Sequence, residues 1–304
     1  MAVPLDKAAI LITGASSGIG AALARLVAQQ VPTTRLILTA RRIEQLNTIA
    51  EDCRAQGADV LVIPADLSDD RAVQNLVAQV LDWAGTVDIL VNNAGYGQMG
   101  PLEFVPIEAA KQQLAVNLLG PLALTQALIP TMRQKGGGHI INISSIGGRI
   151  AFPLGGWYSA SKFALECLSD VLRMELQPFN IQVSVVEPGP VKTPFFEVAN
   201  TSTESLPDLQ STPYRAAFSA VEGLEQRLQQ QAFSAERVAR TIFTAMAANK
   251  PHPRYVVAKG GRLLLFLMTT LLPRWAVDRF WQRFYGIDRV AEDWHQRQAA
   301  EATD

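Results

Sequence analysis

The chain has 304 residues, of which 48% are hydrophobic and 18% are charged, a composition that supports a sizeable core and argues against disorder. The formal net charge of −1 comes without a basic stripe, which argues against a nucleic-acid partner. Only two cysteines occur, Cys53 and Cys167, without metal-ligand neighbours at short spacing, so we expect no disulfide framework, no metal site and a reducing cytoplasm.

The first motif is a glycine-rich turn between a strand and a helix. Residues 8–13 form a short apolar run that predicts a buried strand, and a helical pattern runs from Gly18 to about Gln30. Such a turn presents backbone N–H groups and a helix N-terminus to a phosphate. Its spacing, G-x-x-x-G-x-G, differs from the G-x-G-x-x-G fingerprint, and a tight connection without a ligand is the alternative.

Two arginines follow the second predicted strand, residues 35–39. In dinucleotide-binding folds the end of this strand meets the adenosine ribose, where an acidic residue binds the 2′-hydroxyl of NAD and an arginine accommodates the 2′-phosphate of NADP. Here Arg41 and Arg42 occur without an acidic residue, so the pattern favours NADP. A basic helix start on the surface is the alternative.

Strands and helices continue to alternate, with further elements expected at 43–56, 59–64, 69–84 and 87–92. This repeat predicts a parallel sheet with right-handed crossovers. Asp66 follows the third strand, as a partner for the adenine amino group or as a helix cap, for which Ser68 or Asp69 is the better candidate. Asn93-Ala94-Gly95 follow the fourth strand, at the edge where α/β sheets bind ligands.

One long helix is predicted over residues 106–133. Its apolar middle carries Asn117, and a buried polar group needs partners, for which we expect a backbone carbonyl, a water, or both. Pro121, inside the same helix, should disturb the local hydrogen bonds.

The next elements carry residues suited to proton transfer. Residues 139–144 predict the fifth strand, and Ser145 follows it where a hydroxyl can donate to a developing oxyanion. Tyr158 and Lys162 are four residues apart at the start of a helix, so they share a face. A nearby ammonium would bring the pKa of Tyr158, ordinarily about 10, closer to that of a useful general acid. Each feature alone also fits a structural serine, or a half-buried ring beside a solvated lysine.

In this order the motifs resemble the short-chain dehydrogenase/reductase family over about residues 8–258. The resemblance rests on Thr13-Gly14-x-x-x-Gly18-x-Gly20, Asn92-Asn93-Ala94-Gly95, Asn117, Ser145, Tyr158-x-x-x-Lys162, and Pro188-Gly189 followed by Thr193. It implies a Rossmann-type α/β fold, a three-layer doubly wound parallel sheet of seven strands, with a helical C-terminal extension. The sixth and seventh strands are expected at 181–187 and 254–258.

The resemblance also implies residue roles. Tyr158 would exchange a proton with the substrate oxygen, which Ser145, rather than its neighbour Ser144, would orient. Lys162 would lower the pKa of Tyr158 and bind the nicotinamide ribose, and Asn117 would hold a water that relays protons to Lys162. Asp66 would lie near the adenine, Arg41 on the 2′-phosphate, and Thr193 by the carboxamide. The residues expected to bind NADP(H) are Gly14, Ser16, Ser17, Gly18, Ile19, Gly20, Arg41, Arg42, Asp66, Leu67, Asn93, Ala94, Gly95, Tyr158, Lys162, Pro188, Gly189, Val191 and Thr193.

The chain is expected to divide at residue 258. Residues 1–258 would form the NADP-binding catalytic domain, with a substrate lid at 195–230 and with Ser234 capping the helix that follows. Residues 259–304 would form the apolar and amphipathic extension, in which no run reaches the about 18 residues that span a bilayer.

The extension begins with a block of apolar residues that Pro273 ends. An amphipathic helix is predicted after it, with several arginines and with apolar positions at Val277, Phe280, Trp281 and Phe284. Three interpretations stay open for this tail: packing on its own domain or a partner subunit, lining a lipophilic substrate entrance, or resting on a membrane surface through residues 262–285.

The sequence therefore predicts a cytoplasmic, NADP-dependent carbonyl reductase or alcohol dehydrogenase acting on a lipophilic ketone or aldehyde, peripherally membrane-associated if the tail rests on a membrane. Ketosteroids, retinoids, long-chain 3-keto lipids and small xenobiotic ketones all fit. A homodimer or homotetramer is expected from the resemblance. The alternatives are an isomerase or dehydratase on the same fold, and a catalytically silent NADP(H) sensor, which should lack the Tyr158–Lys162 pair.

Overall fold

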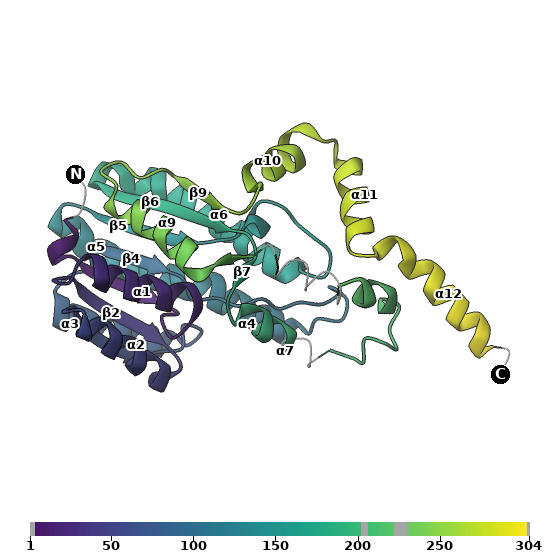
Figure 1. The fold of residues 1–304 in the computed structure, drawn as a ribbon, viewed down its shortest axis with the longest axis horizontal. Helices are drawn as coiled ribbons and strands as arrows, with labels where there is room; N and C mark the ends of the chain where they lie inside the picture. Colours follow the sequence, from purple (N-terminus) through teal and green to yellow (C-terminus); the bar gives the residue numbers. More distant parts are fainter. Residues whose placement is uncertain (1–3, 202–205, 222–229, 231, 303–304) are drawn as a thin grey trace.

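The computed structural model describes residues 4–201, 206–221, 230 and 232–302. Its main sheet has seven parallel strands in the order β3-β2-β1-β4-β5-β6-β9 (Figure 1). Their bounds are β1 Ala9–Thr13, β2 Arg35–Ala40, β3 Asp59–Pro64, β4 Ile89–Asn92, β5 Gly138–Ile143, β6 Ile181–Pro188 and β9 Arg254–Val257. The strand order reverses between β1 and β4, which confirms the predicted doubly wound sheet and puts its ligand-binding crevice at that switch point.

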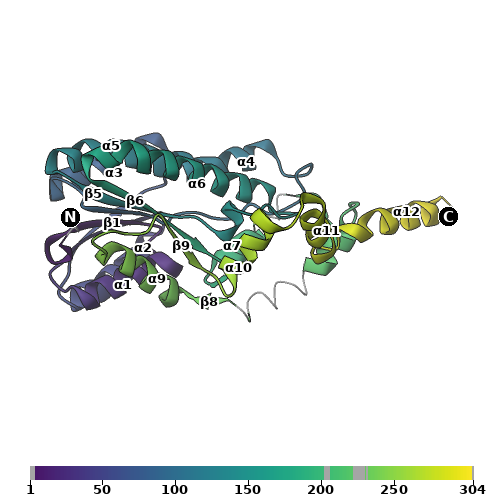
Figure 2. The same cartoon turned by 90° about the horizontal axis from the view of Figure 1, so that it is seen from above.

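Helices cover both faces of the sheet (Figure 2). One layer contains α1 Gly18–Gln30, α2 Ile43–Ala55 and α9 Ala235–Ala247, and the other contains α3 Asp70–Ala84, α4 Ile107–Leu114, α5 Gly120–Lys135 and α6 Gly156–Leu176. In β1, Ile10 and Ile12 pack with the first layer, Leu11 packs with the second, and all three are fully buried. Strands covered on both faces read as continuous apolar runs, which is why the sequence predicted them.

The helix expected over 106–133 is interrupted. α4 ends at Leu114, a π-helical turn covers Ala115–Leu119, and α5 begins at Gly120. Pro121 lies in the first turn of α5, where its missing N–H is tolerated and the wider turn absorbs the lost hydrogen bond. The expected disturbance near Pro121 is confirmed, and the expected uninterrupted helix is wrong.

Taken as one stretch, Ile107–Lys135 is the one helix of the described residues that is long and apolar enough to cross a membrane. The sequence was expected to contain no such stretch. Leu124, Leu128 and Met132 are fully buried in the cluster beneath this helix, so its apolar face packs as that of a core helix.

Shorter elements lie near the carboxyl ends of the strands. β7 Val191–Lys192 pairs with β8 Phe233–Ser234, and α7 Phe195–Thr201 begins the predicted lid. The lid continues through helical residues at 215–221, whereas 202–205, 222–229 and 231 lie outside the described residues. Ser234 accepts a hydrogen bond from Arg237 N at 3.3 Å, which confirms it as the cap of α9.

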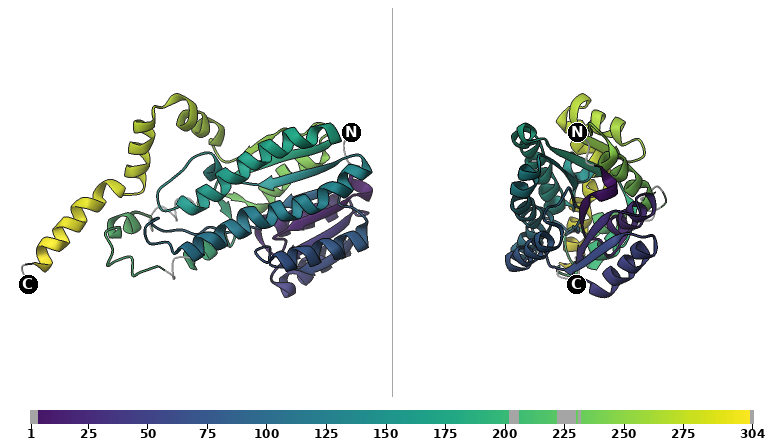
Figure 3. Two further views of the ribbon diagram at one scale, coloured as in Figure 1. Left: turned by 180° about the vertical axis from the view of Figure 1, so that it is seen from behind. Right: turned by 90° about the vertical axis from the view of Figure 1, so that its left-hand side faces the viewer.

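The C-terminal tail leaves the sheet after β9 and extends away from it (Figures 1 and 3). It consists of α10 Gly261–Phe266, a π-helical turn Leu267–Leu271, α11 Arg274–Phe284 and α12 Val290–Glu301. α12 lies within the extension that was expected to be helical, but no separate helix was predicted there, because no residue of it is buried and its apolar pattern is weak.

Candidate active site

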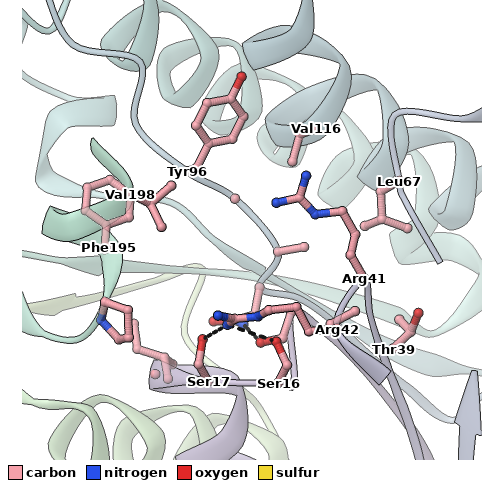
Figure 4. Close-up of a pocket in the computed structure, with 18 of the residues that line it drawn as sticks. Ser16, Ser17, Thr39, Arg41, Arg42, Leu67, Tyr96, Val116, Phe195 and Val198 are labelled. Atoms are coloured by element: carbon pink, nitrogen blue, oxygen red, sulfur yellow. Dashed lines mark hydrogen bonds between the residues drawn. The ribbon is translucent and has the colours of Figure 1, made fainter. Parts of the chain in front are cut away.

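A groove of about 300 Å³ follows the carboxyl ends of β1, β2, β3 and β4 (Figure 4). The predicted cofactor residues that line it are Gly14, Ser16, Ser17, Gly18, Ile19, Arg41, Arg42, Asp66, Leu67, Asn93, Ala94, Gly95 and Thr193. Residues outside the predicted cofactor set also line it: Thr39, Ala40, Ala65, Tyr96, Val116 and Pro194, together with Phe195 and Val198 from the predicted lid. The structure thus gathers motifs up to about 180 residues apart into one concave surface at the switch point.

The glycine-rich turn brings backbone to the floor of this groove. Gly14 and Gly18 have φ of 65° and 55°, in the left-handed region that favours glycine. A Cβ on Gly14 would lie 2.9 Å from the Cα of Ala94, so only glycine lets the turns after β1 and β4 approach so closely. The first turn of α1 contains no acidic residue, and Ser17 makes no side-chain cap. The helix start therefore leaves N–H groups and a positive dipole end for an anion.

Two guanidinium groups stand over the turn. Arg42 Nη2 donates to Ser17 Oγ at 2.8 Å and to Ser16 Oγ at 3.3 Å (Figure 4). Arg41 lies on the other side, with Nη1 3.9 Å from Asp66 Oδ2 and a side chain that is 71% exposed. The groove therefore has a cationic rim beside a hydroxyl pair, a combination suited to a phosphate.

Asp66 and the turn after β4 are fixed by local hydrogen bonds. Asp66 Oδ1 accepts from the N and Oγ of Ser68 at 2.9 and 2.8 Å, whereas Asp69 caps α3, so the cap interpretation of Asp66 is wrong. Thr13 Oγ1 accepts from Asn93 N and Ala94 N, both at 2.9 Å. These bonds tie the ends of β1 and β4 together beneath the groove.

Ser145, Tyr158 and Lys162 converge where β5 ends against α6. The Ser145 hydroxyl interacts with the Tyr158 phenol, and its Oγ accepts from Gly147 N at 3.0 Å and donates to Pro188 O at 3.4 Å. Lys162 Nζ donates to Ile143 O at 2.7 Å, at the last residue of β5. Tyr158 and Lys162 are 8% and 5% exposed, so both polar groups act in a dry environment. Ser144 lies beside Glu166 instead: burial raises the pKa of the Glu166 carboxyl, and Ser144 partly opposes that rise.

Burial controls the acidity of these groups. It raises the pKa of the Tyr158 phenol above its ordinary value, and the hydrogen bond with Ser145 partly opposes that rise. The pKa of Tyr158 is therefore shifted upward overall, opposite to the net lowering expected from the sequence, because the loss of solvation on burial is the largest effect. Burial also lowers the pKa of Lys162 to about 8, opposed by the carboxylate of Glu166 one helical turn away. Tyr158 is protonated at neutral pH, and Lys162 is mostly an ammonium.

Asn117 finds its partners inside the protein. Its Nδ2 donates to Tyr96 O at 2.9 Å and to Ser161 Oγ at 3.1 Å, and its Oδ1 accepts from Tyr96 N at 3.0 Å. The expected bond to a backbone carbonyl is confirmed. A Cβ on Gly95 would lie 3.1 Å from Asn117 Oδ1 and 3.5 Å from Lys162 Nζ, so Gly95 separates the groove from these two side chains.

Some predicted cofactor residues do not line the groove: Gly20, Tyr158, Lys162, Pro188, Gly189 and Val191. Gly20 closes the turn instead, because a Cβ there would lie 2.5 Å from Gly14 O. Phe195 lines the groove and meets the Tyr158 ring edge-on at 5.5 Å between centroids, so its ring lies where the groove adjoins Tyr158. Phe195 was expected only as the first residue of the lid, and its contact with Tyr158 could not be predicted because it depends on where α7 packs.

Aromatic side chains of the C-terminal tail also lie near Tyr158. Phe152, between β5 and α6, stacks on Tyr285, with 5.9 Å between the ring centroids and 10° between the ring planes. The ring centroid of Trp281 is 6.5 Å from that of Phe152. A Cβ on Gly147 would touch the rings of both Phe152 and Tyr158, at 3.1 and 3.3 Å. The inner side of α11 therefore packs on its own chain, beside the candidate catalytic tyrosine.

Comparisons with known proteins agree with this geometry. Residues 8–204 match the family model of short chain dehydrogenases. The chain is 35% identical over 266 residues to the probable short-chain type dehydrogenase/reductase VdlC of Helicobacter pylori strain J99, covering 87% of this chain and 93% of that protein. It is 34% identical over 256 residues to human 17-beta-hydroxysteroid dehydrogenase type 1, covering 83% and 77%. A short-chain dehydrogenase/reductase from Burkholderia phymatum, solved in complex with NAD, superposes with a TM-score of 0.77 at 27% identity, covering 88% and 94%.

Proposed function

The chain belongs to the short-chain dehydrogenase/reductase family of oxidoreductases, and we propose that it transfers a hydride between NADP(H) and the carbonyl or alcohol carbon of a lipophilic substrate. The observation that carries the proposal is the convergence of Ser145, Tyr158 and the buried Lys162 at the end of β5, next to a nucleotide-sized groove. A protein without chemistry has no need to bury a lysine and a tyrosine together at that edge.

The groove residues fit a phosphorylated dinucleotide. The uncapped start of α1 would receive the pyrophosphate, and Gly14 and Gly18 let backbone approach it. Arg41 and Arg42 would hold the 2′-phosphate of NADP. No acidic residue follows β2 at the position where one would bind the 2′-hydroxyl of NAD. When bound, the nicotinamide supplies or accepts the hydride.

The protein residues handle the proton. Because burial raises the pKa of Tyr158, the phenol is protonated at neutral pH and donates to the substrate oxygen during reduction. Ser145, held by Gly147 N, orients that oxygen. The Lys162 ammonium, which predominates below its pKa of about 8, stabilises the charge left on the phenol. In the reverse direction the phenolate accepts the proton of the alcohol.

A lipophilic substrate suits the surroundings of Tyr158. Phe152 and Phe195 flank its ring, and Trp281 and Tyr285 extend the aromatic wall from the tail. The similarity to a hydroxysteroid dehydrogenase supports the same substrate class. We propose in addition a cytoplasmic homodimer or homotetramer, which the exposed apolar side chains of α6, among them Met174 at 62%, would help to form.

Replacing Tyr158 with phenylalanine tests the proposal. The ring still packs on Phe195, but the proton donor is gone, so kcat/KM for carbonyl reduction should fall by about 10²- to 10⁴-fold. NADPH affinity, measured by fluorescence, should not change. Turnover is followed as NADPH absorbance against a panel of lipophilic ketones and aldehydes, and Tyr96→Phe, which removes a hydroxyl elsewhere in the groove, is the matched control. Full turnover in the Tyr158 variant would contradict the mechanism, and tight NADPH binding without turnover in the unmodified protein would favour a sensor.

A further inference from the structure

The elbow of the tail, residues 259–276, is an apolar projection. It includes α10, the π-helical turn and the start of α11, and it stands clear of the sheet in Figures 1 and 3. Five of its large apolar side chains are exposed: Leu263 62%, Phe266 52%, Leu271 60%, Leu272 38% and Trp275 74%. So many exposed together on one projection mark a contact surface rather than a random scatter.

The elbow has an inner and an outer side. Gly261 and Leu265, one helical turn apart, are buried, and a Cβ on Gly261 would lie 2.7 Å from the Cβ of Ala258. Leu263 and Phe266 project from the opposite side of the same helix. α11 likewise has a buried and an exposed side. Val277 is 4% exposed, whereas Trp275, two positions earlier and therefore on the other side of the helix, is 74% exposed. The inner side attaches the elbow to the protein, which leaves the outer side for another surface.

Charge identifies that surface. The elbow carries three exposed cations, Lys259, Arg262 and Arg274, and no acidic residue, although the whole chain has a net charge of −1. Arg274 is 82% exposed, with Nε 3.4 Å from Asp278 on the next turn. Apolar side chains with an exposed tryptophan and flanking cations suit the headgroup region of an anionic leaflet. A second copy of the chain would bring the cations of two elbows together.

We propose that the outer side of the elbow binds the surface of a negatively charged bilayer, without spanning it. The apolar helix Gly261–Leu271 is too short to cross the hydrocarbon core. Beyond the elbow, Trp281 on α11 and Tyr285, the residue that follows α11, contact Phe152 beside Tyr158. Binding would therefore hold the entrance to Tyr158 near the leaflet, so that a lipophilic substrate reaches it from the membrane. This last consequence rests on the proposed function, whereas the binding itself does not.

Vesicle flotation of the full chain tests the proposal. The probes are phosphatidylcholine vesicles with and without about one third phosphatidylglycerol, at low and high salt. The unmodified protein should float with the anionic vesicles, and less at high salt. Leu271→Ser with Trp275→Ser should reduce the bound fraction by about 10-fold. The matched control is Ile107→Ser with Leu119→Ser, which removes side chains of similar exposure, 60% and 55%, from α4 and the π-helical turn that follows it and should bind as the unmodified protein does.

Three results would overturn the proposal. They are no flotation of the unmodified protein with either vesicle, equal flotation of the elbow variant, and self-association through the elbow without vesicle binding, which would assign the elbow to a second copy. NADPH oxidation with the panel of lipophilic ketones and aldehydes, measured without vesicles, separates this proposal from the proposed function. Intact turnover without flotation refutes the elbow proposal alone, and flotation without turnover refutes the proposed function alone.

Discussion

The sheet and the tail of this molecule handle apolar side chains in opposite ways. Leu11 in β1 and Leu90 in β4 are fully buried between two helical layers, whereas Leu271 and Trp275 in the tail are 60% and 74% exposed. The free energy of burial therefore accumulates in the sheet and its helices. The exposed apolar side chains of the tail contribute little to the stability of the fold. Their presence is therefore better explained by another surface that the tail contacts.

The two regions also divide the reaction. At the carboxyl edge of the sheet, Lys162 is held by Ile143 O at the end of β5, and Ser145 is held by Gly147 N in the turn that follows. The tail adds an aromatic wall through Trp281 and Tyr285. The reaction class thus follows from the sheet, and the choice of substrate depends on the lid and the tail.

The largest expected effect comes from removing the same side chain in each region. Leu90→Ala leaves a cavity in the central strand and should lower the free energy of unfolding by about 2–5 kcal/mol. Leu271→Ala, at a position 60% exposed, should change it by less than about 0.5 kcal/mol. Urea unfolding of both variants measures the difference. Equal losses would show that the tail belongs to the cooperative core.

Acid should destabilise the sheet through one buried histidine. His139 in β5 is 3% exposed, with Nε2 3.0 Å from Ser184 Oγ, and burial lowers its pKa from 6.5 to about 4. Between these values the unfolded chain binds a proton that the folded chain does not, so stability falls as the pH drops from 6.5 toward 4, by up to about 3 kcal/mol. His139→Gln should flatten this part of the stability profile. A profile of the same steepness in that variant would assign the acid sensitivity to other groups.

The arginines at the sheet edge should act on affinity and leave stability unchanged. Arg41→Ala with Arg42→Ala should raise KM for NADPH by about 10- to 100-fold, a figure kept low because Arg41 is 71% exposed, and should leave KM for NADH unchanged. Arg25→Ala, which removes a 2.7 Å surface ion pair with Asp52 outside the groove, is the control. A strong preference of the unmodified protein for NADH would overturn the coenzyme choice and leave the reaction class intact.

The sequence predicted the sheet closely because its strands are continuous apolar runs ended by turn residues. β2 and β3 begin where they were expected, and the other strands differ by one or two residues. The polar residue inside an apolar helix, Asn117, was correctly expected to bond a backbone carbonyl, since burial demands a partner. The sequence pattern was sufficient for features that depend on a single strand or helix.

Features that depend on several elements could not be predicted in this way. The raised pKa of Tyr158 follows from how α6, α7 and the loop at Phe152 bury the ring, and the Tyr158–Lys162 spacing alone suggested the opposite direction. The position of Phe195 depends on α7, and α12 has no buried side chain to give it a pattern. These misses lie around the substrate side of the site, where packing decides the geometry.

The smallest expected effect concerns the attachment of α12. Arg297 donates to Thr212 O at 2.6 Å and to Gln210 O at 3.1 Å, and Asp293 pairs with both Arg297 and Arg215. Arg297→Ala removes these contacts from a helix with no buried residue, so α12 should open more easily by about 1 kcal/mol while the melting temperature of the protein stays the same. Hydrogen exchange should accelerate in residues 290–301 and remain slow in β4. Gln296→Ala, which removes only a 3.3 Å bond to Glu292 on the same helix, should leave both rates unchanged. If the Arg297 variant accelerated exchange in β4 as well, the tail and the sheet would form one cooperative unit, and the division between them would fail.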